Sequence, residues 1–390
     1  MNQIETFISR LKDFSIINLK HHFNAEQNLF HFREFLNPRR KDELLSFRYS
    51  IIAAIGLIAH KTHPQINELF NLENLHRQLV EKGKQCDSLQ DLGLLLWLDA
   101  QEQAKFANEI LKQIEKVQPQ KNIHAITTYE LAWLLTGLSY ILLNNPALQS
   151  SHRSEYIQKI YHHLNERFQP RTHLFYHLAT DNPKYRLRGA ISDFADQIYS
   201  IYANLCYYEL TGEARALEIA VNCGQKLVAL QGPQGEWWWL YNTNTGHVAY
   251  RYPVYSVHQD GMAPMVLMKL IQITQQDWKP ALYKSLHWLF HENGCEKINF
   301  NTQQIIRGIQ IAPACLKHVA VLFSALNLNT VQESIIYRFF KKIDLINEFR
   351  PYHLGWILYF IGYWERMTEH HQSLKNSADF SRTTNITKTV

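Results

Sequence analysis

Helical segments of two kinds alternate along most of the chain, and this alternation constrains the fold more than any other feature. One kind is apolar on nearly every face, and the other carries its charges on one side. A helix of the first kind must be surrounded by protein, whereas a helix of the second kind covers it. Six of each predict an all-α toroid with inner helices over 47–60, 88–100, 127–143, 191–210, 261–273 and 351–367, and outer helices over 3–19, 64–81, 101–117, 151–168, 214–230 and 278–291.

The connecting segments predict which end of this toroid is elaborated. Connections that lead into an inner helix are often long, at 169–190, 231–260 and 292–350, whereas those that leave one are short. We therefore expect the long loops at one mouth, where the inner helices begin. Alternating aromatic residues around a turn predict a β-hairpin over 236–252, and a second is expected around His173–His177. Helical pieces are expected near 313–326 and 331–345.

The chain is long for one domain, but a closed toroid needs that length. We predict a single domain over 1–370, followed at 371–390 by a polar, disordered tail rich in Ser, Thr and Asn. The first residues lack the apolar core of a signal peptide. The uncharged run 131–143, which ends at a polar break, is shorter than the roughly 20 residues that span a bilayer. No membrane span and a cytoplasmic location are therefore expected.

Charge and cysteine content argue against several classes of partner. The net charge of +5 is spread along the chain without a basic block or a recognition motif, so nucleic acid is not an expected partner. The five cysteines include no CxxC pair, and no HExxH sequence occurs. The turn at 232–235 lacks the context of a nucleotide-binding loop. We predict no metal site and no cofactor, and the pattern does not specify an oligomeric state.

One third of the chain carries a family resemblance. The relevant segments are the inner-helix phrase Asp193-Phe194-Ala195-Asp196-Gln197-Ile198-Tyr199 with its end at 208–212, the outer helix 214–230, the loop strand 235–239 and the next inner start at 255–262. In these the chain resembles the six-hairpin glycosidase-like superfamily of (α/α)6 toroids. The resemblance implies a carbohydrate-active enzyme, but it indicates no single family, so no catalytic residues are carried over.

Titratable side chains are predicted to converge at the mouth, because the N-termini of all inner helices point there and favour anionic groups. Asp193 and Asp260 begin consecutive inner helices, and Asp196 follows Asp193 by one turn. Such carboxylates suit the acid and base of glycoside hydrolysis, with Asp196 as the substitute for Asp193. Structural roles stay open: Asp260 as a helix N-cap, and Asp196 in an ion pair with Arg186 or Arg188.

The segment 250–261 is unusually dense in polar and aromatic groups. We expect His258 to serve catalysis or positioning there, and the other candidates for substrate binding are Arg251, Tyr255, Gln259, Tyr129, His353, Trp237 and Trp239. Tryptophans at a pocket mouth suit the apolar faces of sugar rings. The alternative is that one face of their hairpin is simply seated on the rim of the toroid, and that His258 is a structural histidine.

The favoured hypothesis is a glycoside hydrolase whose partner is a short, acidic oligosaccharide or a related sugar-containing molecule. A lyase or epimerase is the first alternative, with His258 or Tyr255 as the base and Arg251 as the counter-ion. A non-catalytic toroid that binds a glycan is the second, because a fold alone confers no chemistry.

Overall fold

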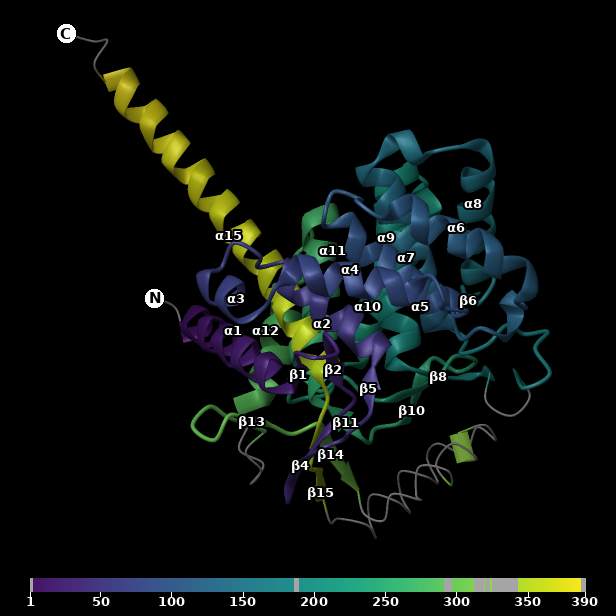
Figure 1. Cartoon of the computed structure of the whole chain (residues 1–390), viewed down its shortest axis with the longest axis horizontal. Helices are drawn as coiled ribbons and strands as arrows, with labels where there is room; N and C mark the ends of the chain where they lie inside the picture. The colour runs from purple at the N-terminus through teal and green to yellow at the C-terminus, as the bar shows by residue number, and fades with distance from the viewer. Residues whose placement is uncertain are drawn as a thin grey trace.

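The computed structural model describes residues 3–185, 189–290, 297–311, 319, 323–324 and 343–386, with side chains up to residue 368 in the last helix. Its helices form a ring, and its short strands gather at one end of that ring (Figure 1). None of the helices in these ranges is both long enough and apolar enough to cross a membrane.

The inner ring confirms the predicted toroid. Each inner helix packs against the next, and the last closes onto the first. In chain order the ring consists of α2 (Phe47–Ile58), α5 (Leu89–Ala100), α7 (Thr128–Asn144), α9 (Phe194–Thr211), α11 (Ala263–Thr274) and α15 (Pro351–Ile386). Outside it lie α1 (Gln3–His22), α3 (Pro64–Leu69), α4 (Leu72–Gly83), α6 (Ala107–Val117), α8 (Ser151–Asn165), α10 (Ala214–Leu230) and α12 (Lys279–His287). The fold is therefore an (α/α)6 toroid.

Irregular helical turns connect these elements within the described ranges. They are 3-10 turns at Gln118–Gln120, Ile123–Ala125, Pro146–Leu148 and Trp288–Phe290, and a π-helical turn, η5 (His258–Met262), that leads directly into α11.

The strands form small antiparallel sheets where the inner helices begin. One sheet joins β1 (Phe23–Asn24), β2 (Leu29–His31) and β5 (Leu45–Ser46), and another joins β3 (Glu34–Leu36), β4 (Arg39–Lys41) and β16 (Glu348–Phe349). The others are β6 (Phe168–Gln169) with β7 (Leu174–Phe175), β8 (Ile191–Asp193) with β9 (Leu240–Asn242) and β10 (His247–Tyr250), β11 (Val254–Tyr255) with β14 (Gly308–Ile311) and β15 (Ile343–Ile346), and β12 (Ile298–Asn299) with β13 (Gln304–Ile305).

The predicted loops are only partly reproduced. The hairpin expected over 236–252 is β9–β10, but the strand begins at Leu240, after the tryptophans. The second hairpin, β6–β7, lies a few residues before the expected position. The expected helical pieces fall largely outside the described residues, and Ile343–Ile346 at the end of that range is a strand. Helix α15 continues to Ile386 and extends beyond the ring (Figure 1), while the domain boundary at 370 stays a prediction.

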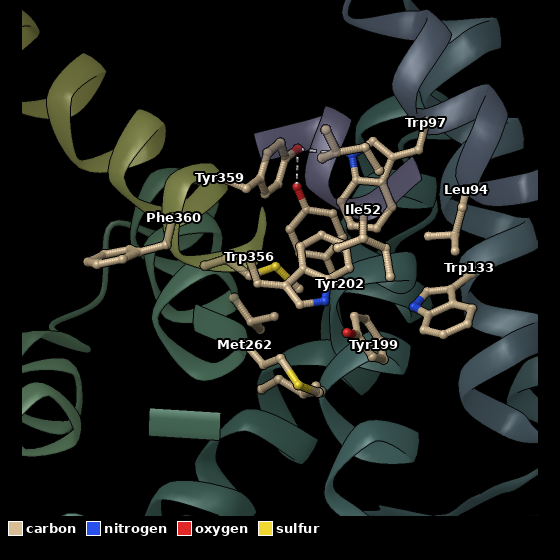
Figure 2. Packing of buried hydrophobic residues seen from close by; sticks show 14 of the residues in the cluster. Ile52, Leu94, Trp97, Trp133, Tyr199, Tyr202, Met262, Trp356, Tyr359 and Phe360 are labelled. Carbon is tan, nitrogen blue, oxygen red and sulfur yellow. Dashed lines mark hydrogen bonds between the residues drawn. The ribbon is translucent and has the colours of Figure 1, made fainter. Parts of the chain in front are cut away.

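Close backbone contact between inner helices depends on glycine. A Cβ atom on Gly137 of α7 would lie 1.9 Å from the carbonyl oxygen of Gly93 in α5, and one on Gly56 of α2 would lie 2.2 Å from that of Gly355 in α15. Even alanine would therefore force these helices apart. Between the helices, large aromatic side chains fill the centre of the ring (Figure 2).

The end of the ring opposite the mouth contains a tyrosine cluster, defined as Tyr140, Tyr202, Tyr359 and Tyr363. The Tyr202 hydroxyl hydrogen-bonds to the hydroxyls of the other three at 2.8–2.9 Å. Trp97 Nε1 donates to the Tyr359 hydroxyl at 3.0 Å, as Figure 2 shows. Lys269 Nζ donates to Glu209 at 2.5 Å and lies over the Tyr140 ring. These bonds join α5, α7, α9, α11 and α15.

Candidate active site

The start of α9 presents two carboxylates in different environments. Asp193 ends β8 and is the N-cap of α9: its Oδ1 accepts from the Asp196 backbone N–H at 3.0 Å. Asp196 in turn accepts from the Asp193 backbone N–H at 2.9 Å, which completes a capping box. Aspartate is favoured at an N-cap because its carboxylate satisfies otherwise unpaired N–H groups. Both side chains are therefore fixed by the local sequence.

Asp196 is fully buried and holds neighbouring segments together. Its Oδ1 accepts from the Tyr129 backbone N–H at the start of α7 at 3.2 Å, and its Oδ2 hydrogen-bonds to His177 Nδ1 at 2.8 Å. A buried carboxylate is tolerated because these donors replace its water. The alternative partners Arg186 and Arg188 lie outside the described residues. This arrangement makes Asp196 an anchor and leaves Asp193, which is only partly buried, as the more accessible carboxylate.

The charge of Asp193 acts on two tyrosines near the starts of other inner helices. The pKa of Tyr129 is raised by burial first, and the charges of Glu130 and Asp193 raise it further. The pKa of Tyr255 is also raised mainly by burial, with Arg307 opposing the effect and Asp193 adding to it. The backbone gives the position of Asp193 directly: Asp193 pairs with Leu240 in the β8–β9 ladder, and the next residue, Phe194, donates its N–H to the Trp239 carbonyl at 3.0 Å.

Tyr255 is the centre of a group of aromatic and cationic side chains at the mouth. The His258 ring lies 5.3 Å from it and the Trp239 ring 6.2 Å from it, both edge-on. The guanidinium carbon of Arg307 lies 4.9 Å from the centre of the Tyr255 ring. Tyr255, Trp239 and Arg307 are all partly exposed. Together they present an aromatic and cationic surface next to Asp193.

Arg307 is a site residue that the sequence reasoning missed. It precedes β14, which pairs with β11 and so brings Arg307 beside Tyr255. Its Nη1 donates to Glu348, which also accepts from Arg350 Nε at 2.9 Å. Its Nε is buried and has no hydrogen-bond partner. No local pattern indicates this role, because β11, with which the strand pairs, lies some fifty residues away in the chain.

Arg251, which we expected beside the substrate, lies elsewhere. Its guanidinium carbon is 5.5 Å from the centre of the Trp238 ring. Trp238 itself donates to the backbone of Leu230 at the end of α10. Arg251 thus lies against Trp238, whereas Arg307 lies against Tyr255.

His258 lies under this surface. It is buried, and its ring centre is 4.5 Å from that of Phe194. Burial lowers its pKa to about 3, against a hydrogen bond to the Trp237 backbone that raises it, and Arg307 and His353 lower it further. The imidazole is therefore neutral near pH 7, and its Nδ1 has no hydrogen-bond partner.

Asp260, a predicted catalytic residue, is enclosed by the protein. It is fully buried, and both its oxygens lie within 2.7–2.9 Å of His353 Nε2 on α15. Burial raises the pKa of Asp260, while the His353 interaction opposes that shift. Asp260 lies inside the π-helical turn η5 and is not the N-cap of the helix. We therefore assign Asp260 and His353 to the support of the mouth, connecting α11 with α15.

Gln259 and Trp237 form a second buried support. Gln259 Oε1 accepts from the Trp237 backbone N–H at 3.0 Å, and Trp237 Nε1 donates to Ser285 Oγ at 2.7 Å. Ser285 Oγ donates to the Gln259 backbone carbonyl at 2.6 Å. Trp237 is only 2% exposed, so its ring belongs to the core, and Trp239 is the more accessible tryptophan.

A further polar group connects the starts of α2, α5 and α7. Arg48 Nε donates to Asp91 at 2.5 Å, and its Nη1 donates to Glu130 at 3.4 Å. The Arg48 guanidinium carbon also lies 5.3 Å from the centre of the Trp133 ring. These residues extend the charged lining of the mouth beyond Asp193.

Only one cluster in the described part of the mouth has donor atoms suited to a metal ion. Ligand atoms of His177, Asp193 and Asp196 all lie within 4.8 Å of one another. The oxygens of Asp196 already accept from N–H donors, as described above, which is the pattern of a fixed hydrogen-bonded carboxylate.

Solved structures with this fold include sugar-processing enzymes. A variant of the unsaturated glucuronyl hydrolase from Streptococcus agalactiae, complexed with dGlcA-GalNAc6S, matches 93% of this chain and 91% of its own at 9% identity and a TM-score of 0.60. An unsaturated glucuronyl hydrolase specific for heparin matches 93% and 98% at 12% identity and 0.59. A sugar epimerase from a ruminal bacterium matches 73% and 87% at 9% identity and 0.55.

No protein-family model matches the sequence, and no curated protein is significantly similar to it. The similarity therefore lies in the fold, and it confirms the (α/α)6 toroid.

Proposed function

We propose that this protein is a glycoside hydrolase that acts on a short, acidic oligosaccharide at the mouth of its toroid. The observation that carries the proposal is the placement of Asp193. Its partly buried carboxylate caps α9, and the backbone pairing of β8 with β9 puts this cap next to Trp239, whose ring lies edge-on to Tyr255. The shared fold supports the proposal, since it relates almost the whole chain to unsaturated glucuronyl hydrolases.

Asp193 would exchange a proton with the glycosidic oxygen or with the attacking water. Such general acid–base catalysis requires a carboxyl group fixed within hydrogen-bond reach of the reacting atoms. The capping box fixes Asp193, and Asp196 holds the start of α9 against α7 through Tyr129. Asp196 is thus a positioning residue in this proposal.

The acidic character of the substrate is inferred from Arg307. Arginine binds carboxylates through its planar fork of N–H donors. Arg307 lies over Tyr255, and its buried Nε lacks a partner, so the arrangement offers a donor on the floor of the mouth. Trp239, edge-on to Tyr255, offers an aromatic surface for a sugar ring.

The test is mass spectrometry of an oligosaccharide panel, neutral and uronic-acid-containing, incubated with the pure protein. Hydrolysis gives shortened products that carry one added water. Asp193→Asn should reduce turnover by about 100-fold or more, with little change in melting temperature because Asn caps helices as well as Asp does. Full turnover by Asp193→Asn would overturn the assignment.

Substrate charge is tested separately with Arg307→Met. We expect a higher KM for uronic-acid-containing substrates and little change for a neutral analogue. An equal loss on both kinds of substrate would show that Arg307 acts on the structure of the mouth and not on substrate charge.

An epimerase is the second candidate, favoured by the contact of Tyr255 with the neutral imidazole of His258 and by the fold shared with a sugar epimerase. Epimerisation leaves the mass of the sugar unchanged. Loss of activity in His258→Asn with full activity in Asp193→Asn would select it. A glycan-binding protein would keep its affinity in Asp193→Asn and lose it in Trp239→Ala.

A further inference from the structure

A cluster of metal-ligating side chains lies outside the mouth, where the first helix ends. His21 and His22 are the last residues of α1, and Glu34 is the first residue of β3. His21 Nε2 lies 3.1 Å from Glu34 Oε1, and His22 Nε2 lies 3.4 Å from Glu34 Oε2. The ligand atoms of all three residues lie within 4.8 Å of one another.

His22 is the unusual member of this cluster. It is 1% exposed, its ring stacks on Phe349 with centres 4.5 Å apart, and neither of its ring nitrogens has a hydrogen-bond partner. A buried polar group without a partner destabilises the folded state. A metal ion binds the lone pair of a neutral imidazole nitrogen, and a buried ring nitrogen without a partner can supply one.

Some charges around the cluster favour the binding of a cation, and others oppose it. The carboxylate of Glu34 and the C-terminal end of α1 favour a cation. Arg39 and Lys41 oppose it, and His31 would do so if protonated. However, Arg39 Nε donates to Glu34 Oε1 at 2.9 Å and so orients the carboxylate, as partners of metal ligands commonly do. Lys41 Nζ is directed to the backbone carbonyl of His21 at 2.5 Å.

We propose that His21, His22 and Glu34 bind a Zn²⁺ ion through His21 Nε2, His22 Nε2 and Glu34 Oε2, with water as the fourth ligand. Bonds of about 2.0–2.1 Å to nitrogen and oxygen imply ligand separations of about 3.3 Å in a tetrahedral site. The separation of His22 Nε2 from Glu34 Oε2, 3.4 Å, is close to that value, and His21 Nε2 lies 3.1 Å from the other oxygen of the same carboxylate. Coordination would give His22 Nε2 the partner that it otherwise lacks.

The site would stabilise a strand that contributes to the mouth. Glu34 pairs with Phe349 in the β3–β16 ladder. The preceding residue, Glu348, holds both Arg307 and Arg350. Zinc would therefore link the end of α1 to the ladder that fixes Arg307. The inference does not depend on the proposed activity.

Zinc content tests the proposal. The full-length protein is stripped with a chelator, incubated with ZnCl₂, desalted and measured by elemental analysis. We expect one retained equivalent in the wild type and none in His22→Phe. Replacing Zn²⁺ by Co²⁺ should give the visible absorption of a tetrahedral site.

The matched control is His163→Ala. His163 belongs to another adjacent histidine pair and hydrogen-bonds to Glu166 at 3.3 Å, but on the outer surface of α8. This variant should keep the zinc equivalent. If His22→Phe does not fold, His21→Ala replaces it, because that side chain is 41% exposed and its loss should spare the fold. Retention of the equivalent in these ligand variants, or no zinc in the wild type, overturns the proposal.

Discussion

The mouth and the opposite end of the toroid are built from the same inner helices, but their polar groups differ in burial and in their hydrogen-bond partners. In the tyrosine cluster, hydroxyls bond to one another, to Trp97 and to Lys269. At the mouth, Asp193, Trp239, Tyr255 and Arg307 are partly exposed around a common region. Tyrosine abounds at both ends, so residue type alone does not distinguish support from function; burial and partners do.

The difference predicts that substitutions of buried groups with partners inside the protein reduce stability at either end, and that substitutions of the partly exposed groups at the mouth reduce activity. Hydrogen bonds closed within the protein stabilise packing, whereas partly exposed groups can exchange water for a ligand. Each prediction below tests this division.

Trp97→Ala should have the largest effect on stability. Trp97 is fully buried, and its ring packs on Tyr202 with centres 5.0 Å apart. Loss of such a side chain costs about 3–5 kcal/mol. Urea unfolding measures the loss, and the turnover per folded molecule should stay at the wild-type level. A loss of turnover per folded molecule would show that Trp97 also contributes to activity, which would contradict the division between support and function.

Asp260→Ala should destabilise the protein by about 3 kcal/mol, because it leaves His353 buried without its partner. Chemical denaturation of the two single variants and of Asp260→Ala/His353→Phe forms a double-mutant cycle. We expect the double variant to lose less than the sum of the single losses. Additive losses would show that the two side chains do not act as a pair.

Tyr202→Phe should cost about 1 kcal/mol, since the ring stays and the shared hydroxyl is lost. Thermal unfolding of Tyr202→Phe provides the measurement. The control is Tyr283→Phe, at a partly exposed ring on α12 outside the tyrosine cluster, which should leave the stability almost unchanged. Equal losses of stability in both variants would show that the hydrogen bonds of the tyrosine cluster do not contribute to stability in particular.

His258 should make the stability depend on pH by about 1 kcal/mol between pH 7 and pH 5.5. Its pKa of about 3 in the folded state lies below the unfolded value of 6.5, and burial is the main cause. The unfolded chain therefore takes up a proton that the folded chain does not, and stability falls as pH falls below 6.5. His258→Asn should show a smaller decline over this range in urea titrations; an unchanged decline would contradict the assignment.

Sequence patterns located the helices well, because the period of apolar residues is a local property. The inner stretches at 88–100 and 127–143 correspond closely to α5 and α7. Asp193 at the start of α9 follows from local capping preference. These features need only neighbours along the chain.

The sequence does not show how deeply each of these side chains is buried. Asp193 and Asp260 occupy similar places near the starts of consecutive inner helices, but only Asp260 meets His353 from a helix ninety residues later and is buried by it. Trp237 and Trp239 differ in the same way, because the indole of Trp237 donates a hydrogen bond to Ser285 inside the protein. Which of two like residues faces the mouth was decided by distant partners.

The tertiary structure alone placed Arg307 beside Tyr255, and His21 and His22 beside Glu34. Each of these contacts depends on an antiparallel strand pairing or a chain reversal whose register the local pattern does not encode. The sequence by itself thus determined which segments form helices and which of them are enclosed, since burial of apolar faces requires it. Closure of the ring then decided which polar side chains became supports and which were left at the mouth.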